Sequence, residues 1–374
     1  MKYYIIAGEA SGDLHGSNLI KELKKKDQDA NIRCWGGDLM QTEGATLVKH
    51  YRDLAFMGFV EVLLNLKTIL KNIAFCKKDI LEFKPDSIIL IDYPGFNMRI
   101  AEFAKQQGIR VHYYISPQIW AWKQNRGFKL KRTVDKMFVI LPFEKEFYKK
   151  FDMEVDYVGH PLIDAIENRL KSDSEKAELR RELNLRDKKI IALLPGSRLQ
   201  EVSKMLPIML KQAKHFPEYE FVLAAAPSLD DAIFADYLKD YQNFSVVRNR
   251  TYDLLQLSYA AMVTSGTATL ETALFKVPEV VCYKGSFISY HIAKRIINIK
   301  YISLVNLIMD REVVKELIQG EMNEKLLRLE LGKLLKDSEK RNEMLDNFNL
   351  LNNKLGGGGA SAKTAELIIE DLKT

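Results

Sequence analysis

Two short segments combine glycine with hydroxyl or guanidinium side chains in an order suited to binding phosphate. The first reads LLPGSR and covers residues 193–198. Glycine lets backbone N–H groups approach an anion closely, and the N-terminus of a helix favours negative charge. Because arginine adds five donors in a planar fork, Gly196, Ser197 and Arg198 are predicted to hold a diphosphate.

The second segment, TSGTATLETA, offers hydroxyl and backbone N–H groups from Ser265, Gly266, Thr267 and Thr269. Glu271 follows inside the expected helix, where its carboxylate can accept two hydrogen bonds from a ribose diol. The alternative is an ordinary helix with a Ser/Thr cap and with Glu271 as an acid near its start. Two such turns in one half of the chain favour a nucleoside diphosphate site.

Asp92 stands directly after a very apolar run, in the segment IDYPGFN at 91–97. Pro94 and Gly95 break the backbone before the next expected helix. A carboxylate at the carboxyl end of a strand is suited to act as a general base. The alternative is that Asp92 only caps a turn.

The opening turn, AGEASGDLHG at 7–16, has the glycine pattern of a phosphate loop but carries two carboxylates. These carboxylates would repel a diphosphate, so we expect the turn to serve the acceptor sugar, whose hydroxyl and amide groups can donate to them. The residues expected there are Glu9, Ser11, Gly12 and Asp13. Alternatively, Asp13 does no more than favour the helix dipole.

Large apolar side chains alternate with lysines between residues 54 and 84, a pattern typical of a helix lying in a lipid interface. Lysines beside anionic head groups and apolar side chains along an acyl chain would both suit a lipid substrate. The residues expected at this surface are Phe56, Met57, Phe59, Leu63, Leu64, Lys67 and Lys71. The alternative is a core helix with a lysine face.

A second basic and aromatic cluster lies between residues 120 and 132 and could hold the acceptor phosphate or lipid. Its members are Trp120, Trp122, Lys123, Arg126, Phe128, Lys129, Lys131 and Arg132. Nucleic acid is the weaker interpretation, because no recognition motif accompanies the charge. We therefore expect an anionic membrane surface as a partner, and no nucleic acid.

Short β-branched or aromatic runs alternate with longer helical patterns, which predicts an α/β fold with parallel sheets covered on both faces. The predicted strands are 3–7, 31–35, 87–91, 110–115, 136–140, 155–158, 189–194, 220–225, 245–248, 261–264 and 279–283. We predict two doubly wound, Rossmann-like domains, 1–165 and 166–350, facing across a cleft, and a glycine-hinged C-terminal helix in 351–374. Ligands bind such folds at the carboxyl ends of the strands.

The composition is that of a globular enzyme, with 47% hydrophobic and 28% charged residues and a net charge of +6 over 374 residues. Cys34, Cys76 and Cys282 are widely spaced and form no CxxC pair, which argues for a reducing compartment and against disulfides or zinc. Neither a targeting segment nor an apolar run of the ~20 residues that span a bilayer is visible. A cytoplasmic location is therefore expected.

Two motifs look like ligand sites but lack the context that such sites need. Asp27-Gln28-Asp29 follows a lysine run, without the apolar strand that precedes a metal-clamping Asp-x-Asp, so no metal is expected. GGGASAKT at 357–364 nearly copies a phosphate loop, but no strand is predicted before it. A departing diphosphate would then rely on Arg198 and helix N-termini, and we expect activity in a chelator.

The motifs, in their order along the chain, resemble those of the lipid-A-disaccharide synthases, membrane-associated glycosyltransferases with two Rossmann-like domains of the GT-B type. The resemblance covers nearly the whole chain and rests on GEASGD (8–13), MGFVEVL (57–63), IDYPGFN (91–97), SPQIWAW (116–122), LPFEKEFY (141–148), VGHPL (158–162), LLPGSR (193–198), SGTATLE (265–271) and SLVNLI (303–308). Two positions depart from the family pattern, Gly95 and Gly36-Gly37-Asp38, where an acidic residue and an AGP-type turn are common.

The resemblance implies transfer of 2,3-diacylglucosamine from UDP-2,3-diacylglucosamine to 2,3-diacylglucosamine 1-phosphate, with inversion at the anomeric carbon. The products would be a β-1,6-linked disaccharide 1-phosphate and UDP, formed without a cofactor at the inner face of the inner membrane. By resemblance, Asp92 is the base, Arg198 belongs to the donor diphosphate site, and Asn306 is a further polar group of the catalytic site. The sequence also permits a homodimer with exchanged C-terminal segments.

Three other functions fit part of the pattern. A UDP-sugar epimerase of the same fold could share the Ser-Gly-Thr turn and Glu271, but it would not need the basic amphipathic helix. A dinucleotide oxidoreductase should show GxGxxG and an acid about 20 residues later, a spacing that the loop at Gly8 lacks. A non-catalytic membrane-binding protein would tolerate the loss of Asp92 and Arg198.

Overall fold

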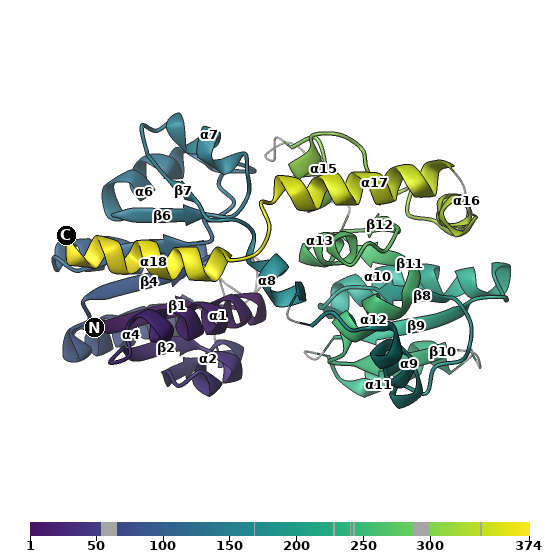
Figure 1. Cartoon of the computed structure of the whole chain (residues 1–374), viewed down its shortest axis with the longest axis horizontal. Helices are drawn as coiled ribbons and strands as arrows, with labels where there is room; N and C mark the ends of the chain where they lie inside the picture. Colours follow the sequence, from purple (N-terminus) through teal and green to yellow (C-terminus); the bar gives the residue numbers. More distant parts are fainter. Residues whose placement is uncertain are drawn as a thin grey trace. The chain divides into compact units, whose positions relative to one another are not determined.

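The chain folds into two compact units, which we call unit 1 (Met1–Asp164 with Gly357–Thr374) and unit 2 (Ala165–Gly356). The structure is a computed structural model that describes residues 1–53, 66–167, 169–226, 229–239, 241, 244–286, 299–336 and 339–374. In each unit, helices cover a single parallel sheet (Figure 1), which confirms the predicted α/β class.

The sheet of unit 1 has seven parallel strands in the order β3-β2-β1-β4-β5-β6-β7. The strands are β1 (Lys2–Ala7), β2 (Asn31–Gly36), β3 (Thr46–His50), β4 (Ser87–Ile91), β5 (Arg110–Tyr114), β6 (Lys136–Val139) and β7 (Asp156–Tyr157). β4 is buried along its whole length, since strands covered on both faces read as continuous apolar runs. The sequence predicted all of these strands except β3.

Helices of unit 1 lie in two layers. On one face α1 (Ala10–Lys26) packs against α2 (Asp38–Thr42) and α18 (Ala360–Lys373), and α1 and α18 lie side by side in Figure 1. A second group joins α4 (Leu66–Phe83), α5 (Pro94–Gln106) and α6 (Gly127–Thr133) in succession. The remaining helical segments are η1 (Tyr51–Asp53), η2 (Gln124–Arg126), α7 (Glu144–Lys149) and α8 (Pro161–Glu167), the last of which continues into unit 2.

The sheet of unit 2 has six parallel strands in the order β10-β9-β8-β11-β12-β13. These are β8 (Ile190–Leu194), β9 (Glu220–Ala225), β10 (Phe244–Arg248), β11 (Ser258–Thr264), β12 (Glu279–Tyr283) and β13 (Lys315–Ile318). The helical segments are α9 (Asp173–Glu182), α10 (Leu199–Leu210), η3 (Lys211–His215), α11 (Asp231–Leu238), α12 (Thr251–Leu257), α13 (Thr267–Leu274), α15 (Leu304–Met309), α16 (Glu324–Leu335) and α17 (Glu339–Lys354).

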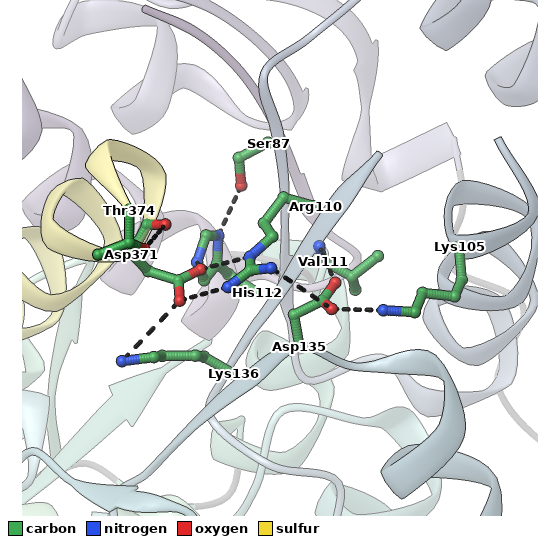
Figure 2. Close-up of polar contacts among 9 residues, drawn as sticks. All are labelled: Ser87, Lys105, Arg110, Val111, His112, Asp135, Lys136, Asp371 and Thr374. Carbon is green, nitrogen blue, oxygen red and sulfur yellow. Dashed lines mark hydrogen bonds and ion pairs between the residues drawn. The ribbon is translucent and has the colours of Figure 1, made fainter. Parts of the chain in front are cut away.

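A polar network at the amino ends of β4, β5 and β6 fastens the last helix, α18, to unit 1 (Figure 2). The carboxylate of Asp371 accepts two hydrogen bonds from the Arg110 guanidinium, both 2.6 Å long, and lies 3.0 Å from His112 Nε2. His112 Nδ1 lies 2.6 Å from the Ser87 hydroxyl, and the Lys136 ammonium lies 3.9 Å from Asp371. The C-terminal helix is therefore an integral part of unit 1.

Candidate active site

Each sheet has one point where the order of the strands reverses, between β1 and β4 in unit 1 and between β8 and β11 in unit 2. Segments that leave the two central strands at such a point diverge, which leaves room for a ligand at their carboxyl ends. In unit 1 these segments begin at Gly8 and Asp92, because Ala7 is paired with Ile91. In unit 2 they begin at Pro195 and Ser265, so the predicted motifs occupy the reversal points of both sheets.

Gly8 and Tyr93 fit together directly at the reversal point of unit 1. A Cβ atom on Gly8 would lie 2.3 Å from Cγ of the Tyr93 ring, so only glycine allows this approach. The Tyr93 ring also stacks on Phe96, with 5.6 Å between the ring centroids. This packing accounts for the glycine and for the two aromatic residues around Asp92.

Asp92 and Tyr93 both have left-handed backbone conformations, with φ of 44° and 48°. Each such residue costs about 1 kcal/mol or more, and it persists only where surrounding contacts hold it. Here the Asp92 carbonyl accepts hydrogen bonds from the Tyr113 hydroxyl at 2.7 Å and from the Asn97 amide at 2.8 Å. Asn97, which is fully buried, also donates to the Ile91 carbonyl at 3.2 Å. The last residue of IDYPGFN therefore fixes the backbone of Asp92.

The Asp92 carboxyl is electrostatically unlike an ordinary aspartate. Burial raises its pKa to about 7, and the carboxylates of Glu9 and Glu144 act in the same direction. The backbone N–H of Tyr93 opposes this shift by donating to the carboxylate. A pKa near the working pH is the property that a general base requires.

Glu144 is a buried acid that the sequence analysis did not select. It begins α7, and its carboxylate accepts hydrogen bonds from the Ser116 hydroxyl and from the backbone N–H groups of Ile140 and Leu141, at 3.2 and 2.8 Å. Burial raises the pKa of Glu144 to about 7. Its signal in the sequence was the segment LPFEKEFY, where an acid follows soon after an apolar strand.

The opening turn divides into an exposed part and a buried part. Glu9 and Ser11 are exposed, whereas Gly12 and Asp13 are buried against the sheet. The Asp13 carboxylate accepts hydrogen bonds from three backbone N–H groups at the start of α2, those of Gly37 (2.8 Å), Met40 (3.1 Å) and Leu39 (3.2 Å). These contacts give Asp13 a structural role, because it caps the N-terminus of α2.

Gly37 is one of the departures from the family pattern, and the position of the Asp13 side chain explains why glycine stands there. A Cβ atom at Gly37 would lie 2.6 Å from Asp13 Oδ2 and 2.4 Å from Cε1 of Tyr51. With the Asp13 carboxylate capping α2 in this way, position 37 has room only for glycine.

The first turn of unit 2 leads from β8 through Gly196, Ser197 and Arg198 into α10. Gly196 has φ of 109°, a conformation that favours glycine. Ser197 and Arg198 are exposed, and the Arg198 side chain retains 57% of its accessible surface. The Glu201 carboxylate accepts hydrogen bonds from the backbone N–H groups of Ser197 (3.1 Å) and Arg198 (3.3 Å) and from the Arg198 guanidinium (3.2 Å). This turn therefore binds a carboxylate of its own helix.

The second turn of unit 2 follows β11, the neighbour of β8. Gly266 and Thr267 are exposed at the start of α13, and a Cβ atom on Gly266 would meet no described atom within 4 Å. The hydroxyl of buried Thr269 donates to the Gly266 carbonyl at 2.8 Å, and the Ser265 hydroxyl donates to the Ile302 carbonyl at 2.9 Å. Both hydroxyls thus support the turn, and the backbone N–H groups of Ser265 and Thr269 donate to the carbonyls of Cys282 (3.0 Å) and Gly266 (3.2 Å). The other N–H groups at the exposed start of α13 are of the kind that suits an anion.

Glu271 lies one turn further along α13. Its Oε1 accepts a 2.8 Å hydrogen bond from the Tyr252 hydroxyl, and the Arg169 guanidinium lies 5.2 Å from the centre of the Tyr252 ring. Burial raises the pKa of Glu271, whereas Tyr252 and the charge of Arg169 lower it. A carboxylate held at one oxygen in this way is oriented for a second set of donors, as a ribose diol would supply.

Asn306 is fully buried and binds the backbone of a neighbouring segment. Its Oδ1 accepts from the N–H groups of Val313 (2.7 Å) and Val314 (3.0 Å), and its amide donates to the Val314 carbonyl and to Glu316, both at 2.9 Å. Glu316 in turn binds Ser303 through backbone N–H and hydroxyl, at 2.9 and 2.8 Å. These contacts make Asn306 part of the scaffold behind the second turn.

A family model described as lipid-A-disaccharide synthetase matches residues 3–366 of the chain. The chain belongs to this family. Curated lipid-A-disaccharide synthases from Trichlorobacter lovleyi and Syntrophus aciditrophicus are 39% and 40% identical to it. The alignments cover 98% and 99% of this chain, and 96% and 97% of those proteins.

Comparison of this chain with solved structures supports its fold. A UDP-GlcNAc 2-epimerase from Neisseria meningitidis bound to UDP-GlcNAc has a TM-score of 0.70 at 16% identity, covering 99% of this chain and 100% of that chain. The glycotransferase of kitacinnamycin has a TM-score of 0.66 at 12% identity, covering 99% of each. At such identities the likeness supports the predicted fold, while the sequence relatives favour the synthase over the alternative epimerase.

The structure describes only part of the surface that the sequence predicts to meet lipid. Phe56, Met57, Phe59, Leu63 and Leu64 lie outside the described residues. Lys67 and Lys71 are exposed on α4, beside exposed Leu70 and Phe75. Across the residues that the structure describes, no helix is both long and apolar enough to cross a membrane.

The second basic and aromatic cluster is largely on the surface. Trp122 and Phe128 are exposed, whereas Trp120 is buried and packs edge-on against Phe143. The cationic groups of Lys123 and Arg126 lie 4.5 and 5.5 Å from the Trp122 ring. Two cations of the cluster have acidic partners, because Lys129 pairs with Glu102 and Lys131 pairs with Asp152.

The two misleading motifs have structural roles. Asp27 accepts hydrogen bonds from the Tyr3 hydroxyl at 3.0 Å and from the N-terminal ammonium group at 2.8 Å. The glycines before α18 lie where the chain returns from unit 2 to unit 1, and Gly357 and Gly359 have φ of 76° and 95°. The segment GGGASAKT therefore connects two units and begins a helix.

Proposed function

We propose that this chain is a metal-independent lipid-A-disaccharide synthase. It transfers 2,3-diacylglucosamine from UDP-2,3-diacylglucosamine to 2,3-diacylglucosamine 1-phosphate, and it forms a β-1,6-linked disaccharide 1-phosphate and UDP. The observation that carries the proposal is Asp92, a carboxyl with a raised pKa at the reversal point of unit 1 in a chain of this family.

Asp92 acts as the base in an inverting displacement. As the acceptor hydroxyl forms its bond to the anomeric carbon, the bond from that carbon to the UDP oxygen breaks, and the hydroxyl proton passes to the Asp92 carboxylate. A pKa of about 7 makes the group a stronger base than an ordinary aspartate while leaving much of it ionised at neutral pH. Glu9 and Glu144 contribute by raising that pKa.

The turns of unit 2 stabilise the charge that develops on UDP. Arg198 and the N–H groups at the starts of α10 and α13 bind the diphosphate, and each such donor contributes ~3 kcal/mol in a dry site. Glu271, held by Tyr252, accepts hydrogen bonds from the ribose hydroxyls. We assign no cofactor.

The other predicted residues divide by exposure. Glu9 and Ser11, which are exposed, contact the acceptor sugar, while Gly12 and Asp13 hold the loops that present them. Asn306 acts as a positioning residue, because its contacts order the 303–316 region behind Ser265.

The protein works at an anionic membrane surface, on the cytoplasmic face of the inner membrane. Support comes from the outer side of α4, where Leu70 and Phe75 retain 54% and 48% of their accessible surface between exposed lysines. Cosedimentation with vesicles containing anionic lipid tests this proposal. A homodimer with exchanged C-terminal segments is a further proposal, supported by the glycines that connect α18 to unit 2, and light scattering tests it.

The decisive experiment supplies both lipid substrates to the purified protein in mild detergent with EDTA, and follows UDP and lipid products by mass. Disaccharide 1-phosphate should form in the chelator and should disappear in Arg198→Ala. UDP release that requires an added divalent ion would overturn the metal-free mechanism. If UDP binds but no lipid product forms from these two substrates, the lipid assignment is wrong.

A further inference from the structure

Glu201 occupies the turn that would receive the donor diphosphate. Its Oε2 accepts from the backbone N–H groups of Ser197 (3.1 Å) and Arg198 (3.3 Å), and its Oε1 accepts from the Arg198 guanidinium (3.2 Å). The carboxylate also rests on Gly196, because a Cβ atom there would lie 2.4 Å from Oε2. Three donors of the predicted diphosphate site thus already bind an anion.

Helix capping accounts for only part of this arrangement. In α9, Glu175 holds the equivalent third helical position, and its carboxylate binds the N–H and hydroxyl of the cap residue Ser172. In α10 the cap residue is Arg198, and the carboxylate binds its guanidinium and one further N–H group, that of Ser197. Compared with α9, the carboxylate thus has one additional N–H donor and a cationic donor in place of a hydroxyl, and both kinds of donor suit an anion.

We propose that Glu201 is an internal competitor of the donor diphosphate, and that it leaves the turn when the donor binds. A carboxylate and a diphosphate need the same donors and carry charge of the same sign, so both cannot be held there together. The inference rests on the proposed function, because it assumes that the donor diphosphate binds to this turn.

The exchange is physically easy. The Arg198 and Glu201 side chains retain 57% and 24% of their accessible surface, and exposed ion pairs of this kind are weak. A diphosphate offers more oxygens and more charge than one carboxylate, so it forms stronger bonds to the guanidinium. Because Glu201 is tethered three residues away, it competes at a high effective concentration and disfavours weakly held anions.

The test measures UDP affinity by calorimetry in the full chain, for the wild type, Glu201→Gln and Glu175→Gln. Glutamine removes the charge but keeps an oxygen that can accept from the turn, so Glu201→Gln should bind UDP about five times more tightly. Glu175→Gln, the matched control in α9, should leave UDP affinity unchanged. Uridine, which has no phosphate, should bind all three proteins equally.

An equal or weaker affinity of Glu201→Gln for UDP, with wild-type thermal stability, would show that Glu201 organises the turn instead of competing for it. If Glu201→Gln is unstable, Glu201→Asp supplies the second variant. Its shorter side chain withdraws the carboxylate from the turn, so UDP should again bind more tightly than to the wild type. Weaker binding of UDP would overturn the proposal. Failure of the wild type to bind UDP at all would overturn the donor site itself, and this inference with it.

Discussion

The two ends of the sheet in unit 1 hold carboxyl groups in opposite electrostatic states. At the amino ends of β4, β5 and β6, Asp371 accepts from Arg110 and His112, and these partners hold the pKa of its carboxyl well below the usual range. At the carboxyl end of β4, burial and two neighbouring acids raise the pKa of Asp92 to about 7. The same strands therefore support both groups, about one strand length apart.

The difference separates a carboxyl that stabilises the fold from the carboxyl that we propose as the base. Asp371 is paired with cations and joins the last helix to the sheet, so ionising it favours the folded state. Asp92 is desolvated and lies beside other acids, so ionising it costs folding free energy. Such a cost is expected at a catalytic group, because a base near neutral pKa cannot also be a well-paired anion.

The largest effect should come from Asp92→Asn, which removes the proposed base but preserves the shape of the side chain. We expect the rate of disaccharide formation to fall by roughly 10³-fold, within the range of general-base contributions. Thermal stability at neutral pH should be higher, because a partly buried carboxylate near like charges is removed. A rate within about tenfold of the wild type would deny Asp92 the role of base.

Asp371→Asn provides the opposite half of the comparison. Breaking a buried ion pair costs several kcal/mol, and the partly exposed Arg110 reduces this to about 2 kcal/mol of unfolding free energy. Urea denaturation measures the loss, and turnover per folded molecule should match the wild type. A normal stability together with a large loss of turnover would mean that Asp371, at the amino ends of the strands, serves the reaction and does not stabilise the fold.

The two groups should also respond to pH with opposite signs. Asp371 has a depressed pKa in the folded state, so its stabilisation is complete above the unfolded value near 4 and is lost as pH falls below it. Asp92 has a raised pKa, so its cost begins near pH 4, grows with pH and levels off above about 7.

Urea midpoints across pH test this difference. The stability gained by Asp92→Asn should be about 3 kcal/mol larger at pH 8 than at pH 4.5, because its pKa is raised from near 4 to about 7. The loss in Asp371→Asn should be constant from pH 5 to 8. The wild-type rate should rise tenfold per pH unit below about 7 and then level off. A rate that does not vary between pH 5 and 8 contradicts a base with this pKa.

The two ends also differ in how far the sequence predicts them. Asp92 follows an unbroken apolar strand and precedes Pro94, so its place at a strand end could be inferred from local pattern alone. Asp371 lies 261 residues from Arg110 along the chain, and no local pattern joins them. β3 and β13 were missed for a related reason: TLVKH and KELI are short and half polar, and only their neighbours in the sheet make them strands.

Site residues follow the same rule. The glycine turns at 196 and 266 were predictable, because positive φ selects glycine and leaves a mark in the sequence. The roles of Asp13, Asn306 and Glu144 depend on backbone N–H groups from other segments, which a single sequence does not reveal.

Unit 2 holds a third kind of carboxyl, which is neither paired with cations like Asp371 nor proposed as a base like Asp92. Its substitution has the smallest expected effect. Glu279, on β12, is fully buried, and neither of its carboxyl oxygens has a hydrogen-bond partner among the described residues. Burial alone raises its pKa well above the usual value, and the group begins β12, away from the carboxyl ends of the strands where the proposed site residues lie.

Glu279→Met should therefore stabilise unit 2 by about 0.5–1 kcal/mol at pH 7, because an apolar side chain replaces an unsatisfied polar one. The gain should increase at pH 9, where ionisation of the wild-type acid costs more, and UDP affinity should not change. Thermal unfolding at both pH values measures this. A less stable Met variant would mean that Glu279 has a polar partner in solution. A loss of UDP affinity would mean that Glu279 has a role in function, as we propose for Asp92.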